Sequence, residues 1–335
     1  MSRSRALRWG AEPPSRAETE GMLEPATRLV LEAGERNPGL AALDLDGALG
    51  RVEHEWAPHQ GLRIHLERHE VDPAAPTVVV APGLGDHARR QLGLAAGLAE
   101  LGMNSMIVDR RGHGLSEGRR GDAPLEVDLD VLELAIGIAR ARSGGPVVLL
   151  GDSLGGILSW YLLTREPDVD AAVCHCISHP DVDLGPSYRF KAPLMRALGL
   201  VLPYAPIPVE RIADYGHVAL DPLTRRYFDE RVDPLFNFTV TARSAASYLR
   251  FVPGVDWSQV AVPALVLIGA ADRMVTPAFT RRALERSRPP RAEYIEIDGA
   301  GHQLFLDHLG AVLGPLGDWM SSALGERDRT AAGGR

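Results

Sequence analysis

The chain has 335 residues, of which 45% are hydrophobic and 24% are charged, and its formal net charge is -8. This composition allows one large globular domain with an insertion, and the negative charge argues against a nucleic-acid partner. The longest apolar run, Ala197–Val209, contains three prolines and is too short to span a membrane.

The first 49 residues form an extension ahead of the main pattern. Residues 1–15 are rich in Arg, Pro and Ser and are expected to be disordered, whereas residues 16–33 carry an apolar stripe at helical spacing. No apolar stretch of the secretory type is present. Cys174 and Cys176 imply no disulfide framework and are expected to be buried core residues. We therefore predict a cytoplasmic protein.

From about residue 50, short apolar runs alternate with helical stretches. Two runs of polar alternation come first and suit edge strands, and buried runs of the parallel type follow. The expected strands are 51–56, 62–69, 77–81, 105–108, 146–150, 171–173, 264–268 and 292–297, and the expected helices are 88–102, 125–142, 154–166, 277–287 and 303–324. This alternation predicts an α/β fold: a doubly wound, mostly parallel sheet with helices on both faces.

Residues 183–255 interrupt the alternation, because they contain prolines and amphipathic pieces but no good buried strand. We predict a helical cap here, since the preceding strand should end at the edge of the sheet where ligands bind. Surface helices without that role are the alternative. The core is then residues 50–182 and 256–325, and residues 326–335 are expected to be a disordered tail.

The strand at 146–150 is followed by Gly151-Asp152-Ser153-Leu154-Gly155 and then by a helix. A G-x-S-x-G motif between a strand and a helix is typical of a nucleophile elbow, in which a tight turn presents the serine. Glycine is needed on both sides because a Cβ there would collide with neighbouring backbone. Ser153 is therefore the predicted nucleophile.

A nucleophilic serine requires a base and a carboxylate that orients the base. His302 follows the last expected strand, and Asp272 follows the strand at 264–268, so the chain order is Ser, acid, His, as in α/β-hydrolases. Asp181 is the alternative acid.

An attacked carbonyl also requires two N–H donors for its oxyanion, and we expect these from Leu154 and from Leu84, in the loop after residues 77–81. His113 and Asp152 are expected to be structural, and His87 to fix a loop or to line the pocket. Neither the spacing of metal ligands nor a nucleotide-binding motif is present, so no metal and no cofactor are predicted.

The chain resembles the monoacylglycerol lipase and lysophospholipase branch of the α/β-hydrolase superfamily over about residues 60–325. The similarity lies in five segments: Pro82–His87, Asp109–Gly118, Gly151–Gly155, Gly269–Val275 and Gly301-His302. The resemblance implies that Ser153, Asp272 and His302 form the triad, that Leu84 and Leu154 form the oxyanion hole, and that Asp233-Pro234-Leu235 is a cap motif.

Two departures from these relatives lie at the site. Pro82 and Asp152 stand where the relatives usually have histidine. The expected activity is hydrolysis of a carboxylic ester with an apolar chain through an acyl-Ser153 intermediate, on a substrate that can differ from a plain monoacylglycerol. A biosynthetic acyltransferase, thioesterase or cyclase with the same triad is the first alternative, and a non-catalytic binding protein is the second.

Overall fold

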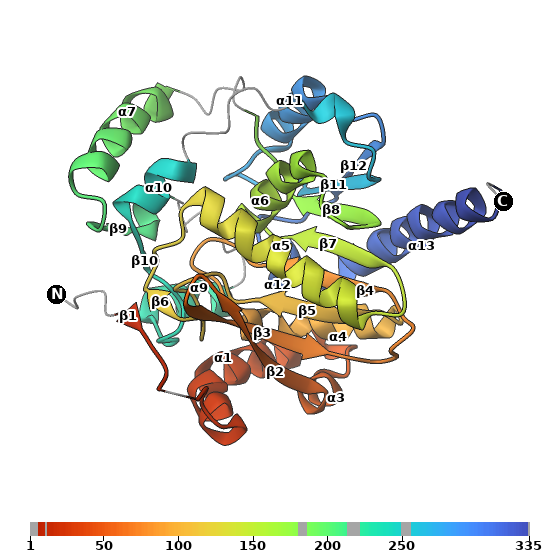
Figure 1. Ribbon diagram of the computed structural model, residues 1–335, viewed down its shortest axis with the longest axis horizontal. Helices are drawn as coiled ribbons and strands as arrows, with labels where there is room; N and C mark the ends of the chain where they lie inside the picture. The colour runs from red at the N-terminus through yellow and green to blue at the C-terminus, as the bar shows by residue number, and fades with distance from the viewer. Residues whose placement is uncertain (1–5, 11, 180–185, 213–221, 249–255, 334–335) are drawn as a thin grey trace.

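The computed structural model describes residues 6–10, 12–179, 186–212, 222–248 and 256–333. An eight-stranded sheet crosses the molecule in the order β12-β11-β8-β7-β4-β5-β3-β2 (Figure 1). Strand β3 is antiparallel to both of its neighbours, and all other neighbours are parallel. The strands are β2 (Val52–His59), β3 (Leu62–His69), β4 (Thr77–Ala81), β5 (Asn104–Val108), β7 (Val147–Gly151), β8 (Ala171–His175), β11 (Ala264–Gly269) and β12 (Ala292–Ile297).

Helices cover both faces of this sheet, which confirms the predicted fold class. Side chains alternate between the faces along each strand. Val79 of β4 and Leu149 of β7 join the core beneath one group of helices, whereas Val78 and Val148 join the core beneath the other. The first group is α5 (Leu125–Arg142), α6 (Leu154–Leu162) and α11 (Pro277–Ser287), and the second is α4 (Leu92–Glu100), α12 (Leu304–Asp307) and α13 (Leu309–Gly333).

The N-terminal extension packs against the core. Residues 1–5 and 11 lie outside the described residues, but the expectation of disorder is wrong for most of the rest. Strand β1 (Ala6–Leu7) pairs with β6 (Gly118–Arg119), and Trp9 donates hydrogen bonds to the Glu117 carboxylate at 2.8 Å and to the Leu115 carbonyl at 3.0 Å. These partners are more than 100 residues away, so local composition did not reveal them.

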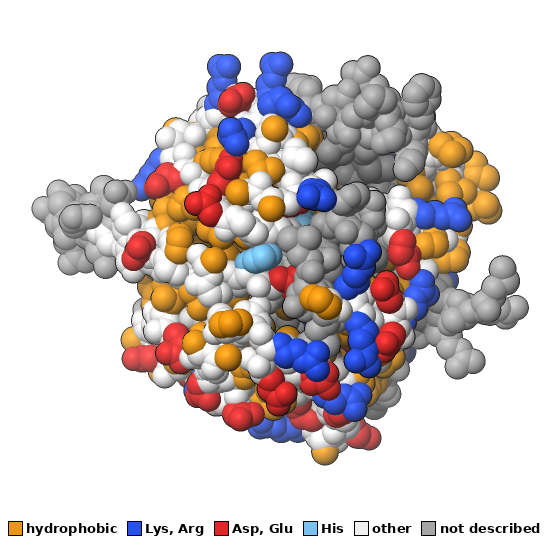
Figure 2. All heavy atoms as spheres, turned by 180° about the vertical axis from the view of Figure 1, so that it is seen from behind, with side chains coloured by type: hydrophobic (Ala, Val, Ile, Leu, Met, Phe, Trp, Pro, Cys, Tyr) orange, Lys and Arg blue, Asp and Glu red, His pale blue; other side chains and the backbone are white. Residues whose placement is uncertain are grey.

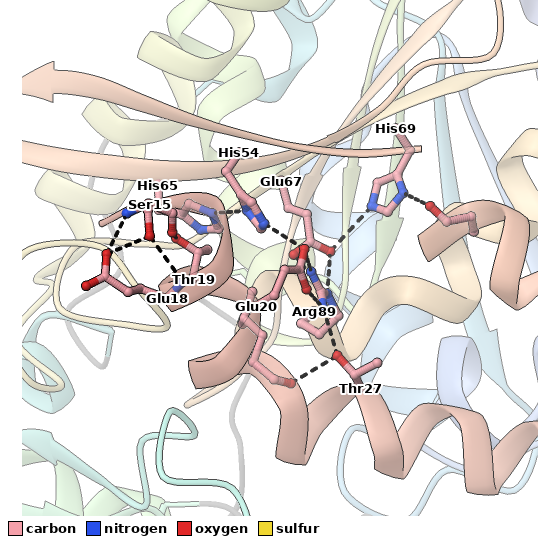
Figure 3. Close-up of polar contacts among 12 residues, drawn as sticks. Ser15, Glu18, Thr19, Glu20, Thr27, His54, His65, Glu67, His69 and Arg89 are labelled. Carbon is pink, nitrogen blue, oxygen red and sulfur yellow. Dashed lines mark hydrogen bonds and ion pairs between the residues drawn. The ribbon is translucent and has the colours of Figure 1, made fainter. Parts of the chain in front are cut away.

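Helix α1 (Arg16–Arg36) confirms the predicted helix, and it is joined to the sheet through buried polar groups (Figure 3). The guanidinium of Arg89 bonds Glu20 and Thr27 of this helix at 2.8 and 2.7 Å, and bonds Glu67 of β3 at 3.0 Å. His54 of β2 also lies 2.9 Å from Glu20. The extension is therefore an integral part of the fold. Two short helices, α2 (Pro38–Ala41) and α3 (Leu45–Gly50), lead from it to β2.

Between β8 and β11 the chain leaves the sheet; we call residues 186–212 and 222–248 the insertion. It contains α7 (Pro186–Val201), α9 (Pro222–Glu230) and α10 (Ala242–Tyr248), as expected of a helical segment. It also contains a two-stranded antiparallel sheet of β9 (Pro206–Pro208) and β10 (Thr239–Thr241), which was not predicted. The strands have three residues each and two prolines flank Ile207, so no strand pattern is visible in the sequence.

At the other end of the chain, α13 ends at Gly333, and the disordered tail at 326–335 stays a prediction. Among the described residues, no helix is both long enough and apolar enough to cross a membrane.

Candidate functional site

Ser153 occupies a strained turn between β7 and α6. Its backbone has φ 52° and ψ -114°, a conformation that residues with a side chain rarely adopt. The flanking glycines are required sterically. A Cβ on Gly151 would lie 2.2 Å from the Gly155 carbonyl oxygen, and one on Gly155 would lie 1.9 Å from the Ala81 carbonyl oxygen. The turn therefore raises the hydroxyl of Ser153 above the carboxyl end of the sheet.

The structure brings Ser153, His302 and Asp272 together from three distant parts of the chain. His302 Nε2 lies 2.9 Å from Ser153 Oγ, and His302 Nδ1 lies 2.7 Å from Asp272 Oδ2. The imidazole and the carboxylate are both buried. Asp181, the alternative acid, lies outside the described residues.

Asp272 is held as an anion. Burial alone would raise the pKa of its carboxyl group, but the hydrogen bond and charge of His302 outweigh burial and lower the pKa. Its Oδ1 also accepts the amides of Met274 and Val275 at 2.8 and 3.0 Å. An anionic acceptor keeps a proton on His302 Nδ1 and so leaves Nε2 free to accept one from the Ser153 hydroxyl.

The two predicted oxyanion donors flank the nucleophile. Leu154 is the first residue of α6, and Leu84 lies in the loop after β4. Neither amide has an acceptor among the described residues. A Cβ built on Gly83 would lie 3.5 Å from Ser153 Cβ, which places the Gly83–Leu84 peptide next to the serine. Two vacant donors beside a nucleophile can hold a developing oxyanion.

A cavity of about 30 Å³ opens beside Ser153 and His302. The loop after β4 lines it with Leu84, and the insertion lines it with Phe228 and Phe236. The cavity also has polar walls, formed by Asp86, Arg90, Asp152 and Gln303.

His175 at the end of β8 was not identified from the sequence. Its Nδ1 lies 2.7 Å from Asp152 Oδ1, and its ring centroid lies 5.1 Å from that of His302. Asp152 is therefore not a free acid beside the nucleophile, since it forms a second carboxylate–imidazole pair. The only signal in the sequence was the position of His175 at the carboxyl end of a buried strand, where ligand-binding residues gather.

His87 and His113 have the loop-fixing contacts expected of them. His87 Nε2 lies 2.6 Å from Asp233 Oδ2 in the insertion, and this aspartate belongs to the Asp233-Pro234-Leu235 motif. His113 Nδ1 donates to the Arg111 carbonyl at 3.0 Å. The His87 contact joins the loop that carries Leu84 to the insertion.

Among the described residues, one group of side chains has the chemistry of metal ligands. Ligand atoms of His175, Cys176, Asp272 and His302 all lie within 4.8 Å of one another. Two of these residues already share the His302–Asp272 hydrogen bond, and burial raises the pKa of the Cys176 thiol well above its ordinary value. A metal would need that thiol as an anion and would compete for the imidazole–carboxylate contact.

Five large apolar side chains of the insertion do not pack against the sheet. They are exposed on α7 and the turn after it: Leu194, Leu200, Val201, Leu202 and Tyr204. Figure 2 shows apolar side chains gathered at this edge of the molecule. Leu198 instead packs inside the insertion, against the cluster that contains Phe236.

The chain is similar in sequence to two known lipases. The chain is 28% identical to a monoacylglycerol lipase of Mycolicibacterium smegmatis over 82% of its own length and 98% of the relative. It is also 28% identical to human monoglyceride lipase, over 68% of this chain and 75% of the relative.

Among solved structures, a soluble variant of the monoglyceride lipase of Saccharomyces cerevisiae shares the fold. Its TM-score is 0.70 at 16% identity, with 82% of this chain and 95% of that chain covered. Residues 72–308, more than half of the chain, match the Hydrolase_4 family, described as serine aminopeptidase, S33. The chain therefore belongs to this family of α/β-hydrolases.

Proposed function

We propose that the protein is a serine hydrolase that cleaves the carboxylic ester of a monoacylglycerol or a related neutral lipid. The observation that carries this proposal is the continuous hydrogen-bonded chain from Ser153 through His302 to Asp272. The names of the two sequence relatives supply the substrate class.

The proposed reaction has two steps. His302 Nε2 takes the proton of Ser153 as the serine oxygen attacks the ester carbonyl, and the amides of Leu84 and Leu154 stabilise the oxyanion. Collapse of this intermediate releases the alcohol, which takes the proton from His302. Water, activated by the same imidazole, then hydrolyses the acyl-Ser153 ester and restores the serine.

The walls of the cavity favour a neutral substrate. The Asp152 carboxylate lies beside the nucleophile and would repel an anionic substrate. The Asp86 carboxylate is paired with Arg90 at 2.9 Å, so these two charges offset each other. The Leu84, Phe228 and Phe236 side chains offer an apolar wall for the acyl chain. We propose that residues 183–255 act as a cap over this cavity. A cytoplasmic location stays a prediction from the sequence.

The test is hydrolysis of 1-monoacylglycerols from C4 to C18 by the native chain and by Ser153→Ala. Ser258→Ala, which changes an exposed serine away from the cavity, is the matched control. We expect Ser153→Ala to lose at least about 10³-fold in kcat and the control to lose none. Ester turnover that survives in Ser153→Ala would overturn the proposal.

The same assay separates the alternatives. Aminoacyl p-nitroanilides test the peptidase activity named in the family description, and added glycerol or another alcohol tests acyl transfer. Faster release of p-nitroaniline than of fatty acid would replace the esterase assignment. Transfer products that outnumber free acid would identify an acyltransferase.

A further inference from the structure

We propose that Arg110 is a positioning residue of the oxyanion hole: it fixes the peptide whose N–H group, that of Leu84, faces the reacting carbonyl. This role rests on the proposed function. It adds a residue from outside the cavity, in the loop after β5, to the machinery of the reaction.

Arg110 contacts the other end of the peptide that carries the donor. Its Nη2 donates to the Gly83 carbonyl oxygen at 3.0 Å. The Gly83 C=O and the Leu84 N–H belong to one planar trans peptide unit, so fixing the direction of the carbonyl also fixes the direction of the N–H. A charged donor on the carbonyl oxygen polarises the amide, which strengthens the N–H as a donor.

The guanidinium is itself rigidly held. The side chain of Arg110 is fully buried, and its Nη1 donates to Asp128 Oδ2 at 2.9 Å and to the Tyr248 hydroxyl at 3.2 Å. Tyr248 OH in turn lies 3.0 Å from Asp128 Oδ2 and donates to the Ala123 carbonyl. Nη1 of the guanidinium is therefore held by residues of α5 and α10, and Nη2 bonds Gly83.

A second anchor lies on the far side of Leu84. Asn237 N, in the insertion, donates to the Gly85 carbonyl at 2.8 Å. Gly85 has φ +78°, and a Cβ there would lie 2.6 Å from the Asn237 carbonyl oxygen. The Gly83–Gly85 turn is thus clamped between the core, through Arg110, and the insertion, through Asn237. Within this clamped turn, the Leu84 N–H has no acceptor among the described residues.

Lysine can replace the charge of Arg110 but not its planar, two-pronged guanidinium, because a single ammonium cannot bond Asp128 and Gly83 in the same geometry. In Arg110→Lys we expect kcat for p-nitrophenyl butyrate to fall about 10- to 100-fold, because the donor is misdirected but not removed and complete loss of one oxyanion donor costs about 10²- to 10³-fold, with KM changed less than about threefold. The Ki of a butyl trifluoromethyl ketone, whose adduct carries an oxyanion, should rise by a factor similar to the fall in kcat.

The matched control is Arg89→Lys. Arg89 is also buried and held by the carboxylates of Glu67 and Glu20, but it makes no contact with Gly83. The Arg89→Lys variant should lower the melting temperature about as much as Arg110→Lys does, and its kcat should stay within about twofold of the native value. If Arg110→Lys fails to fold, Tyr248→Phe loosens the same guanidinium without removing a charge, and it should lower kcat severalfold.

The outcomes are distinguishable. Unchanged kcat and Ki in Arg110→Lys, or in Tyr248→Phe if that variant is used, would overturn the role of Arg110. The proposed function would still stand in that case if the native chain hydrolyses the ester. An equal loss of kcat in Arg89→Lys would also overturn it, because the effect would then follow stability alone. A native chain without Ser153-dependent ester hydrolysis would overturn the proposed function itself.

Discussion

Asp233 should contribute more to stability than any exposed carboxylate of the insertion, and its contribution should depend on pH. Its Oδ2 contacts His87 Nε2 at 2.6 Å and also accepts the Tyr227 hydroxyl, while Oδ1 accepts the Leu235 amide at 2.8 Å. His87 and Asp233 are both buried. Replacement of Asp233 by Asn keeps the shape and the Leu235 contact, but it removes the charge that faces His87.

The direction of the pH dependence follows from the two shifts. Burial alone would lower the pKa of His87, but the Asp233 charge and hydrogen bond outweigh burial and raise it, with help from Asp109 and Asp86. Burial alone would raise the pKa of Asp233, but His87 lowers it. The Asp233 carboxylate contributes to stability at pH values above its unfolded pKa of about 3.9. The His87 imidazolium contributes fully at pH values below its unfolded pKa of about 6.5. The full contribution therefore lies near pH 5–6 and is lost as pH rises through the raised pKa of His87.

Removal of one partner of a buried ion pair costs about 3–5 kcal/mol. We expect Asp233→Asn to lower the free energy of unfolding by that amount at pH 5.5, measured by urea titration followed by fluorescence. Asp229→Asn, which changes an exposed carboxylate of the same helix region, should cost less than about 0.5 kcal/mol. A difference between native and Asp233→Asn that stays constant from pH 5.5 to pH 10 would refute the reasoning.

Three further predictions concern other carboxylates. Asp272→Asn should leave the fold intact but lower kcat about 10⁴-fold, because the amide no longer fixes the His302 tautomer; a loss below tenfold in steady-state assays would contradict this. Asp152→Asn should raise kcat/KM for a hemisuccinate ester about tenfold over a neutral butyrate ester, because one repelling charge is removed; equal changes for both esters would argue against it. Burial alone would raise the pKa of Glu20, but His54 and Arg89 lower it to about 2, so this carboxylate stabilises the protein above its unfolded pKa and the effect is lost as pH falls through 2. Glu20→Gln should cost about 1–2 kcal/mol at pH 7 after allowance for solvent screening, and much less in urea titrations at pH 2; a cost independent of pH would contradict the pairing.

The strands and the site could be predicted for the same physical reason. A strand buried on both faces must be apolar throughout, so β4, β7 and β11 appear as short runs of Val, Leu and Ile. Residues placed directly after such strands gather at one edge of the sheet. Ser153, Asp272 and His302 all follow strands or the turns after them, so their meeting could be anticipated before any distance was known.

The missed features depend on contacts between distant segments. Trp9 is ordered by Leu115 and Glu117, and no local pattern encodes that pairing. The strands β9 and β10 are too short for alternation to be visible. His175 was overlooked because it sits in an apolar run, and its partner Asp152 became meaningful only when β7 and β8 were placed side by side.

The most direct test of the central claim is the covalent identity of the nucleophile. The folded protein is treated with a fluorophosphonate, digested and mapped by tandem mass spectrometry, with His302→Ala and Ser258→Ala treated in parallel. We predict a single adduct on Ser153 in the native chain and in Ser258→Ala, and a strongly slowed reaction in His302→Ala. An adduct on a different serine, or labelling at the native rate without His302, would contradict the account.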